Sequence, residues 1–277
     1  MKIKLGKVNH LTVVKSVDFG MYLDGDEAGE ILLPLRYVPK GCQIGDELDV
    51  FIYLDSEERL VATTQMPYAQ VGDFAYLNVA WVNNYGAFMD WGLMKDLFVP
   101  FREQKMRMQK DKGYVVYLHI DPETYRIMAS AKVERFLSED FPPYNEGDEV
   151  DILVWQKTEL GFKVIVDNQY SGLIYDSEVF RPLRTGDRLK AYVKLVRGDG
   201  KLDIALQKQG KEAITDFSSV LLDYLKSHSG KTSLGDKSPA DEIYAEFGVS
   251  KKVFKKAVGD LYKRRLIQIS PEGITLL

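Results

Sequence analysis

The pattern of hydrophobic and polar positions repeats three times along the chain, over residues 5–65, 71–133 and 146–208. Each unit begins with a β-rich segment that reaches a glycine directly after a bulky residue, at Phe19-Gly20, Tyr85-Gly86 and Leu160-Gly161. A short apolar stretch follows, such as EILLPL or DLFVPF, and two alternating segments joined by a turn close the unit. Alternation with a period of two is typical of half-buried strands. The pattern therefore predicts five short strands in each unit.

Five short strands rich in Val, Ile and Tyr favour a small antiparallel barrel over a helical solenoid. A five-stranded Greek-key barrel of the OB type fits this pattern, because closure removes the sheet edges. Each unit is expected to carry its own small core, so that the barrels follow one another as separate beads. We place the barrels at residues 1–66, 67–140 and 141–211, and a last domain at residues 212–277.

After Lys208 the hydrophobic period becomes helical, first in the segment that begins at Ser218. A polar loop, SGKTSLGDKS, is expected next, with Ser238 as the N-cap of a helix that ends at Gly248. Ser250 then precedes the helix KKVFKKAVGDLYKRR, and the segments LIQIS and ITLL form a terminal hairpin. This order of elements is that of a winged helix. The predicted fold is mainly β with an α/β C-terminal domain.

Composition and charge are those of a folded chain without a membrane-spanning segment. A hydrophobic content of 45% suits a folded chain, and no apolar run approaches the roughly 20 residues of a membrane span. We expect no signal peptide, and the single cysteine, Cys42, fits a reducing cytoplasm. The net charge of −4 requires any nucleic-acid site to be local.

Several motifs resemble those of a known domain family. FGMYL at Phe19 and YGAFM at Tyr85 resemble the FGAFV-like strand of S1-type RNA-binding domains. GLIYDSE at Gly172 and ASAKV at Ala129 resemble the next strand and the closing strand of the same domains. Three such domains followed by a winged helix resemble the bacterial conserved virulence factor B (CvfB) family. This resemblance implies RNA binding and post-transcriptional regulation, without a known chemical step.

The resemblance also implies which side chains face RNA. The two aromatic places of the FGxF strand are filled in the first two units, by Phe19 and Tyr22 and by Tyr85 and Phe88. The third unit departs from the pattern, because Phe162 is displaced by one position and a one-residue shift sends a ring to the other face. Tyr175 takes the place of the family's histidine in that unit.

Whether Tyr85 and Phe88 share a face depends on the backbone between them. Residues three apart on a regular strand lie on opposite faces. Both rings face the same way only if Gly86 supplies a bulge, as glycine in a strand often does. The alternative is that one ring belongs to the core and the other is incidental. Trp81 and Trp91 are interpreted as packing or loop residues.

The second barrel ranks first as a contact site because cations follow its rings. Single-stranded RNA needs rings for its bases and Lys or Arg for its phosphates. The loop FREQKMRMQKDKG would border the ring-bearing face, although charge runs are often only solvated loops. For the acidic first barrel, a protein contact or a structural role is the favoured interpretation. The predicted cationic contacts of the second barrel are Arg102, Lys105, Arg107, Lys110, Arg126 and Lys132.

The winged helix offers a second cationic surface. Lysines repeat along its predicted recognition helix, and arginines lie where that helix meets the wing. The alternative is a solvated helix face favoured by cations near its C-terminus. The residues in question are Lys251, Lys252, Lys255, Lys256, Arg264 and Arg265.

The sequence offers little support for catalysis. His10, His119 and His228 lie in different domains, so we expect no catalytic residue, metal site or cofactor. The leading hypothesis is a cytoplasmic, non-catalytic regulator that binds single-stranded RNA. A DNA-binding transcription regulator that uses the winged helix, with the barrels as protein-interaction modules, is the alternative. A scaffold that binds only protein is the third.

Overall fold

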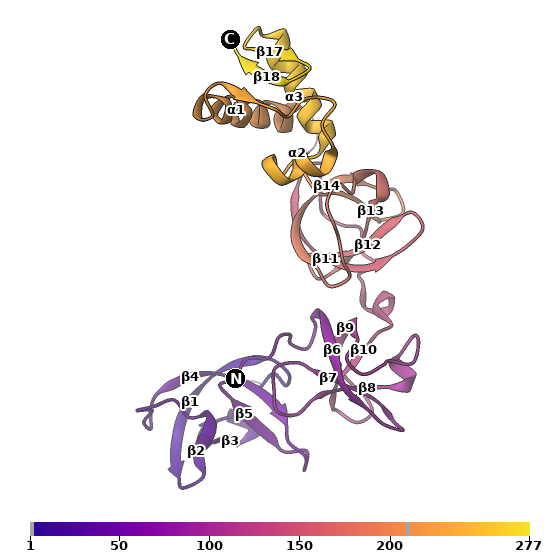
Figure 1. Cartoon of the computed structure of the whole chain (residues 1–277). Coiled ribbons are helices and arrows are strands. Elements are labelled where there is room, and N and C mark those ends of the chain that lie inside the picture. The colour runs from indigo at the N-terminus through magenta and orange to yellow at the C-terminus, as the bar shows by residue number, and fades with distance from the viewer. Residues whose placement is uncertain (1–2, 209–210) are drawn as a thin grey trace. The chain divides into compact units, whose positions relative to one another are not determined.

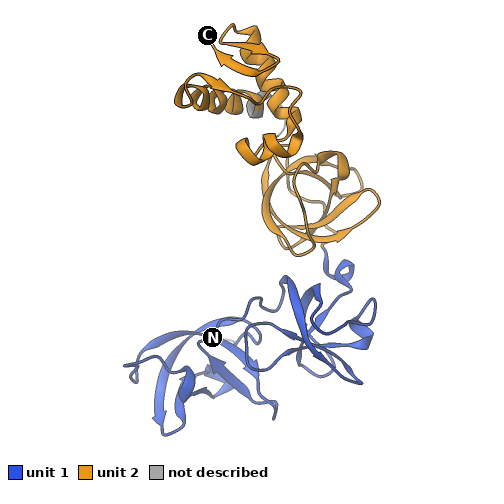
Figure 2. Cartoon of the chain, in the orientation of Figure 1, with its two compact units in different colours: residues 1–137 blue, residues 138–277 orange. Residues whose placement is uncertain are grey.

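The chain forms two compact units in a computed structural model that describes residues 3–208 and 211–277 (Figure 1). The first unit, residues 1–137, holds two closed barrels, and the second, residues 138–277, holds a third barrel and the C-terminal domain (Figure 2). The predicted end of the third barrel, at residue 211, adjoins residues 209–210, which lie outside the described residues.

All three barrels have five strands in the same circular order. Barrel 1 consists of β1 (Val8–Val17), β2 (Gly20–Asp24), β3 (Glu30–Pro34), β4 (Glu47–Leu54) and β5 (Leu60–Thr63). Barrel 2 consists of β6 (Phe74–Val82), β7 (Gly86–Asp90), β8 (Leu97–Pro100), β9 (Gly113–Ile120) and β10 (Ile127–Ser130). Barrel 3 consists of β11 (Glu149–Lys157), β12 (Gly161–Val166), β13 (Tyr170–Tyr175), β14 (Arg188–Val196) and β15 (Leu202–Ala205). The prediction of three tandem five-stranded barrels is confirmed.

Short 3-10 helices connect some of the strands. They are η1 (Asp26–Ala28), η2 (Leu35–Tyr37), η3 (Phe101–Glu103), η4 (Val133–Phe136) and η5 (Asp176–Glu178). In each barrel the third and fifth strands pair in parallel, whereas the other neighbours pair antiparallel. This single parallel contact closes the barrel.

The first strand of every barrel contains a register shift in its second half. The shifts fall between Val13 and Lys15, between Val79 and Trp81, and between Val154 and Gln156. A bulge of this kind adds one residue to the strand and therefore reverses which face the following side chains take. The same irregularity thus redirects side chains at the same place in three barrels.

Barrels 1 and 2 each have a core of their own, but Phe51, Tyr53 and Val61 of barrel 1 also pack into the core of barrel 2, so the expectation of separate beads is wrong for this pair. Phe51 of β4 is fully buried, and its ring packs edge-on against Trp91 of barrel 2 with centroids 5.5 Å apart. The backbone N–H of Val71 also donates to the carbonyl of Gly6 at 2.9 Å. Burial of large rings is the main source of stability in such an interface. The two barrels therefore stabilise each other.

The C-terminal domain has the order of a winged helix. Its elements are α1 (Lys211–Ser227), β16 (Lys231–Thr232), α2 (Ala240–Phe247), α3 (Lys251–Lys263), β17 (Ile267–Ser270) and β18 (Gly273–Leu276). The three strands form one sheet in the order β16-β18-β17. Gly248 ends α2 in the left-handed conformation, with a φ of 67°, as glycine readily does. Within the described residues, no helix is both long and apolar enough to cross a membrane.

Two details of the C-terminal prediction are wrong. The segment SGKTSLGDKS is not entirely loop, because it contains the two-residue strand β16. Ser238 is not the N-cap of α2. Pro239 occupies that position without a side-chain hydrogen bond, and the Ser238 hydroxyl instead accepts from the N–H of Gly235 at 2.9 Å. Ser250 does cap α3, because its hydroxyl accepts from the N–H of Val253.

Candidate nucleic-acid interface

Three aromatic rings form a ladder across neighbouring strands on the outside of barrel 2. Trp81 of β6 pairs with Phe88 of β7, and Phe88 pairs with Phe98 of β8. The rings of Trp81 and Phe88 are stacked, with centroids 3.7 Å apart and an angle of 3° between their planes. Phe98 continues the row at 4.9 Å from Phe88. We call these three residues the ring ladder.

The bulge on β6 creates this arrangement. Before the shift, Val79 faces the core opposite Met89, and both side chains are buried. After it, Trp81 lies opposite Phe88 and is 42% exposed, whereas unbroken alternation would have turned its ring inward. The indole N–H of Trp81 donates to Asp96 Oδ2 at 2.7 Å, which fixes the ring in this outward position.

The predicted bulge at Gly86 is absent, because β7 pairs with β8 without a shift from Gly86 to Met89. Gly86 serves close packing instead, since a Cβ there would lie 2.3 Å from the carbonyl oxygen of Val99. Tyr85 precedes the strand in a turn and is 75% exposed. Trp81 lies on β6 and not in a loop, and its ring packs on Phe88 at the surface of the barrel and not in its core. The interpretation of Trp91 is confirmed as packing, because this side chain is buried.

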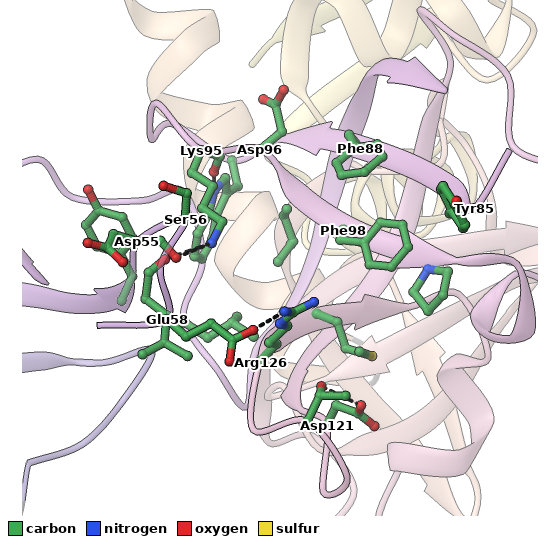
Figure 3. A pocket seen from close by; sticks show the side chains of 18 of the residues that line it. Asp55, Ser56, Glu58, Tyr85, Phe88, Lys95, Asp96, Phe98, Asp121 and Arg126 are labelled. Carbon is green, nitrogen blue, oxygen red and sulfur yellow. Dashed lines mark hydrogen bonds and ion pairs between the residues drawn. The ribbon is translucent and has the colours of Figure 1, made fainter. Parts of the chain in front are cut away.

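The ring ladder lines a groove of about 870 Å³ within the first unit, and Figure 3 shows two of its members, Phe88 and Phe98. Tyr85 lies at one side of the groove, next to Phe88 and Phe98. The opposite side is the hairpin between β4 and β5 of barrel 1, which contributes Asp55, Ser56 and Glu58. The groove is thus built by two barrels, and the sequence gives no local sign of this.

The cations of the groove are all engaged by protein oxygens. Arg126 forms an ion pair with Glu58 across the barrel junction (Figure 3). Arg102 lies 3.0 Å from a carboxylate oxygen of Asp121. Lys95 Nζ donates to the backbone carbonyls of Leu54 at 2.9 Å and Asp55 at 3.0 Å.

Asp121 and Lys95 are two of the groove residues that have shifted pKa values. A hydrogen bond from Thr124, together with the nearby Arg102 guanidinium, holds the pKa of Asp121 below its usual range. Desolvation between the two barrels lowers the pKa of Lys95, and the neighbouring positive charge of Arg126 adds to this effect. Asp121 is therefore a firm anionic partner for Arg102, whereas Lys95 is a cation with a weaker hold on its proton.

Other predicted contacts of barrel 2 lie outside the groove. Of the described loop cations, only Arg102 is among its lining residues. Lys105 pairs with Glu134, and the guanidinium of Arg107 lies 3.4 Å from the ring centroid of Phe101. Lys110 is exposed, and Lys132 is half-buried directly before η4. The loop thus supplies one cation to the ring face and several to the surface beyond it.

The corresponding positions of barrel 1 do not form a ring ladder. Register places Lys15, Tyr22 and Leu32 where barrel 2 has its three rings. Lys15 Nζ lies 5.2 Å from the ring centroid of Tyr22 and pairs with Glu30 at 3.5 Å. Phe19 is 58% exposed and contacts Tyr22 edge-on. In barrel 1, Lys15 of the same barrel thus already lies over the ring of Tyr22.

Barrel 3 departs from the pattern as the sequence predicts. Register places Gln156, Lys163 and Leu173 at the ladder positions. Phe162, displaced by one residue, packs against the core of the barrel. Tyr175 is half-buried at the end of β13, opposite Gly161. Among the described parts of the three barrels, only barrel 2 has a ring at each of the three positions.

The lysines of α3 lie beside barrel 3. Lys252, Lys255 and Lys256 are exposed, and Lys251 is half-buried. Lys252 and Lys256 line a cavity of about 90 Å³ that Ser177 and Phe180 of barrel 3 also line.

The start of α3 is tied to the closing segment of barrel 3. Gln207 Nε2 donates to the Ser250 hydroxyl at 2.5 Å, and the Ser250 N–H donates to Gln207 Oε1 at 3.1 Å. At the other end of the helix, Arg264 pairs with Asp260 at 3.3 Å, and Arg265 has a φ of 58°. The N-terminal end of α3, which reads bases in helix-turn-helix proteins, thus contacts protein.

Metal chemistry has no evident site in the described part of the chain, where no group of three His, Cys, Asp or Glu side chains is placed to hold an ion. His10 is held by Asp49 at 2.8 Å and Glu47 at 3.1 Å, and their hydrogen bonds raise the pKa of its imidazole. This cluster is an exposed feature of barrel 1 and lies outside the groove.

Comparison with known proteins identifies the domains at both ends. Residues 5–65 match the S1 domain, and residues 219–276 match the CvfB-like winged helix domain. The chain is 31% identical to the uncharacterized protein YitL of Bacillus subtilis (strain 168), over 91% of this chain and 87% of that protein. It is 25% identical to conserved virulence factor B of Staphylococcus aureus (strain N315), over 84% of this chain and 80% of that protein.

A solved structure is similar over almost the whole chain. It is described as a multidomain protein with nucleic acid binding domains from Streptococcus pneumoniae TIGR4, and it is 27% identical to this chain. The similarity covers 99% of this chain and 98% of that one, with a TM-score of 0.42. The two matched domain types, S1 and winged helix, indicate nucleic-acid binding.

Proposed function

Because the chain belongs to the conserved virulence factor B family, we propose that it is a non-catalytic, cytoplasmic RNA-binding protein that regulates gene expression after transcription. Single-stranded RNA is the proposed ligand, and the groove of barrel 2 is its principal site. The winged helix and the other barrels are further contacts along the same strand. Several weak modules on one chain gain affinity through effective concentration.

The ring ladder is the observation that carries this proposal. Unpaired bases stack on exposed aromatic rings, and each such contact contributes roughly 1–3 kcal/mol with little dependence on base identity. Trp81 and Tyr85 are exposed, and both line the groove with Phe88 and Phe98. Bases inside a duplex are already stacked on one another, so a row of rings favours single strands.

The surroundings of the rings support a phosphate backbone in the groove. Arg102 and Arg126 line it and are more than half exposed, at 54% and 60% of their side-chain surface. A chain with a net charge of −4 attracts polyanions only where cations gather. Rings and guanidinium groups lie in one groove, so single-stranded RNA finds both contacts that it needs there once its phosphates replace the carboxylates on Arg102 and Arg126.

The contacts of α3 favour RNA over the DNA alternative. A winged helix reads duplex DNA with the N-terminal part of its recognition helix inside the major groove. Here Ser250, at that end, is hydrogen bonded to Gln207 of the barrel 3 segment. Lys252 and Lys256 also line a small cavity with barrel 3, so barrel 3 lies beside the part of the helix that would enter the major groove. The lysines of α3 are therefore assigned to RNA phosphates.

Titration of the full chain with single-stranded RNA, duplex RNA and duplex DNA of matched length tests the proposal. Single-stranded RNA is expected to bind most tightly. Its logarithmic affinity should fall with the logarithm of salt concentration, with a slope of about 0.7 per phosphate contact. Tighter binding of duplex DNA supports the transcription regulator instead. Absence of salt-dependent binding to any nucleic acid supports the protein scaffold.

A further inference from the structure

The second wall of the groove belongs to the acidic barrel 1. The β4–β5 hairpin places Ser56 and Glu58 among the lining residues, opposite Phe88 and Phe98 of barrel 2 (Figure 3). An S1-type barrel on its own would present its rings on an open face. In this chain a neighbouring barrel encloses that face from the side.

The hairpin is held in a defined shape. The Asp55 carboxylate accepts from the backbone N–H groups of Glu57 at 2.8 Å and Arg59 at 3.0 Å. Glu58 has a φ of 65°, in the left-handed region that residues other than glycine seldom adopt. Such a conformation persists only where the surrounding contacts impose it, and it is common at binding sites.

The hairpin is also anchored to barrel 2. Lys95 donates to the carbonyls of Leu54 and Asp55, at the end of β4 and the start of the turn. Phe51 of the same strand packs in the core shared with Trp91. The position of Glu58 relative to the rings is therefore set by two independent sets of contacts.

Glu58 contacts Arg126, the cation that a phosphate group of bound RNA would also contact. It pairs with Arg126, whose side chain lies beside the ring ladder in the groove. Both partners are more than half exposed, and exposed ion pairs of this kind are weak. A carboxylate and a phosphate oxygen bind a guanidinium in the same way, through charge-assisted hydrogen bonds. A phosphate group is thus able to replace Glu58.

We propose that the RNA site is shared by two barrels, and that Glu58 of barrel 1 occupies the phosphate position on Arg126 until an RNA strand displaces it. This inference rests on the proposed function, since it assigns the second wall of the same groove. In this proposal Arg126 contacts an RNA phosphate, and Glu58 competes with that phosphate for the Arg126 guanidinium. Barrel 1 thereby lowers the affinity of the groove for RNA, although its own acidic surface does not attract RNA.

The test compares two isosteric changes on one hairpin. Glu58→Gln removes the competitor, and Glu57→Gln removes an equal charge that pairs with Arg59 and does not line the groove. In the full chain, Glu58→Gln is expected to raise the affinity for single-stranded RNA about threefold, in line with a weak exposed pair. Glu57→Gln is expected to leave it within a factor of about 1.5, because its charge is screened by Arg59 and solvent.

Arg126→Gln completes a double-mutant cycle. It is expected to lower the affinity of the chain and to abolish the gain from Glu58→Gln. Equal effects of the two Glu variants, a loss of affinity in Glu58→Gln, or a gain that persists without Arg126 would each overturn the proposal. If the unaltered chain does not bind single-stranded RNA, the proposed function fails. If it binds and depends on the ladder, but the two Glu variants agree, only the shared site fails.

Discussion

Replacing Trp81 with alanine removes one end of the ring ladder while leaving the core of barrel 2 in place. The ring is 42% exposed and stacks on Phe88 at 3.7 Å, outside the buried cluster of the barrel. Loss of that ring pair should reduce the free energy of unfolding by about 0.5–1.5 kcal/mol. Loss of a stacking surface for one base should weaken RNA binding by roughly 1–3 kcal/mol. This corresponds to roughly 5- to 150-fold in the dissociation constant.

The assay is fluorescence anisotropy with a labelled single-stranded RNA and the full-length variant. Trp81→Phe separates the two roles of the side chain, because phenylalanine keeps a ring but cannot donate to Asp96. It is expected to retain most of the affinity that alanine loses. Phe141→Ala is the matched control, since Phe141 is 65% exposed and does not line the groove. An affinity within a factor of about two of the unaltered chain, in a folded Trp81→Ala variant, would refute the stacking argument.

Three further predictions concern stability. Hydrogen bonds from His10 to Asp49 and Glu47 raise the pKa of its imidazole in the folded state. His10 therefore contributes fully to the free energy of unfolding below its ordinary pKa of 6.5, and this contribution is lost as the pH rises through its folded-state pKa. His10→Gln should therefore make the urea midpoint depend less on pH above 6.5, whereas an unchanged slope contradicts this origin. Trp91→Ala should lower the free energy of unfolding by about 3–5 kcal/mol and destabilise barrels 1 and 2 together, so two separate urea transitions would contradict the shared core. Ser250→Ala should remove about 0.5–2 kcal/mol of helix capping and accelerate amide exchange in the first turn of α3, and unchanged protection there would show that the cap is dispensable.

Most strands and the turn before α3 follow from local patterns, whereas the predicted N-cap Ser238 does not hold. The alternation of period two predicts the strands of all three barrels, because each strand has one buried and one outer face. Gly248 and Ser250 mark the turn between α2 and α3, since a left-handed glycine and a hydroxyl cap are local chemistry. The strand β16 escaped prediction because two residues are too few to show a period.

The face of a ring next to a bulge is harder to predict. One extra residue on β6 exchanges the inward and outward faces of the side chains that follow it. Regular alternation therefore predicts that Trp81 points into the barrel, whereas in the structure it points outward. A glycine within a strand favours a bulge at Gly86, but that glycine serves close packing. β1 and β11 shift their register at the corresponding place, so the bulge is a feature that the three barrels share.

Contacts between barrels are invisible to local pattern. Phe51 alternates as an inward residue of its own strand, and nothing near it in sequence indicates that its ring meets Trp91. The Glu58–Arg126 pair likewise joins residues of two barrels. From the sequence, each of these charges belongs only to the surface of its own barrel. Tertiary packing, rather than propensity, decides such contacts.

Photo-crosslinking of single-stranded RNA to the full chain, with identification of the attached peptides, tests the central claim most directly. The account predicts crosslinks within barrel 2, on the peptides that carry Trp81, Tyr85, Phe88 or Phe98. Further crosslinks at the lysines of α3 are consistent with it. Crosslinks confined to α3 or to barrel 3, with none on the groove of barrel 2, would contradict it.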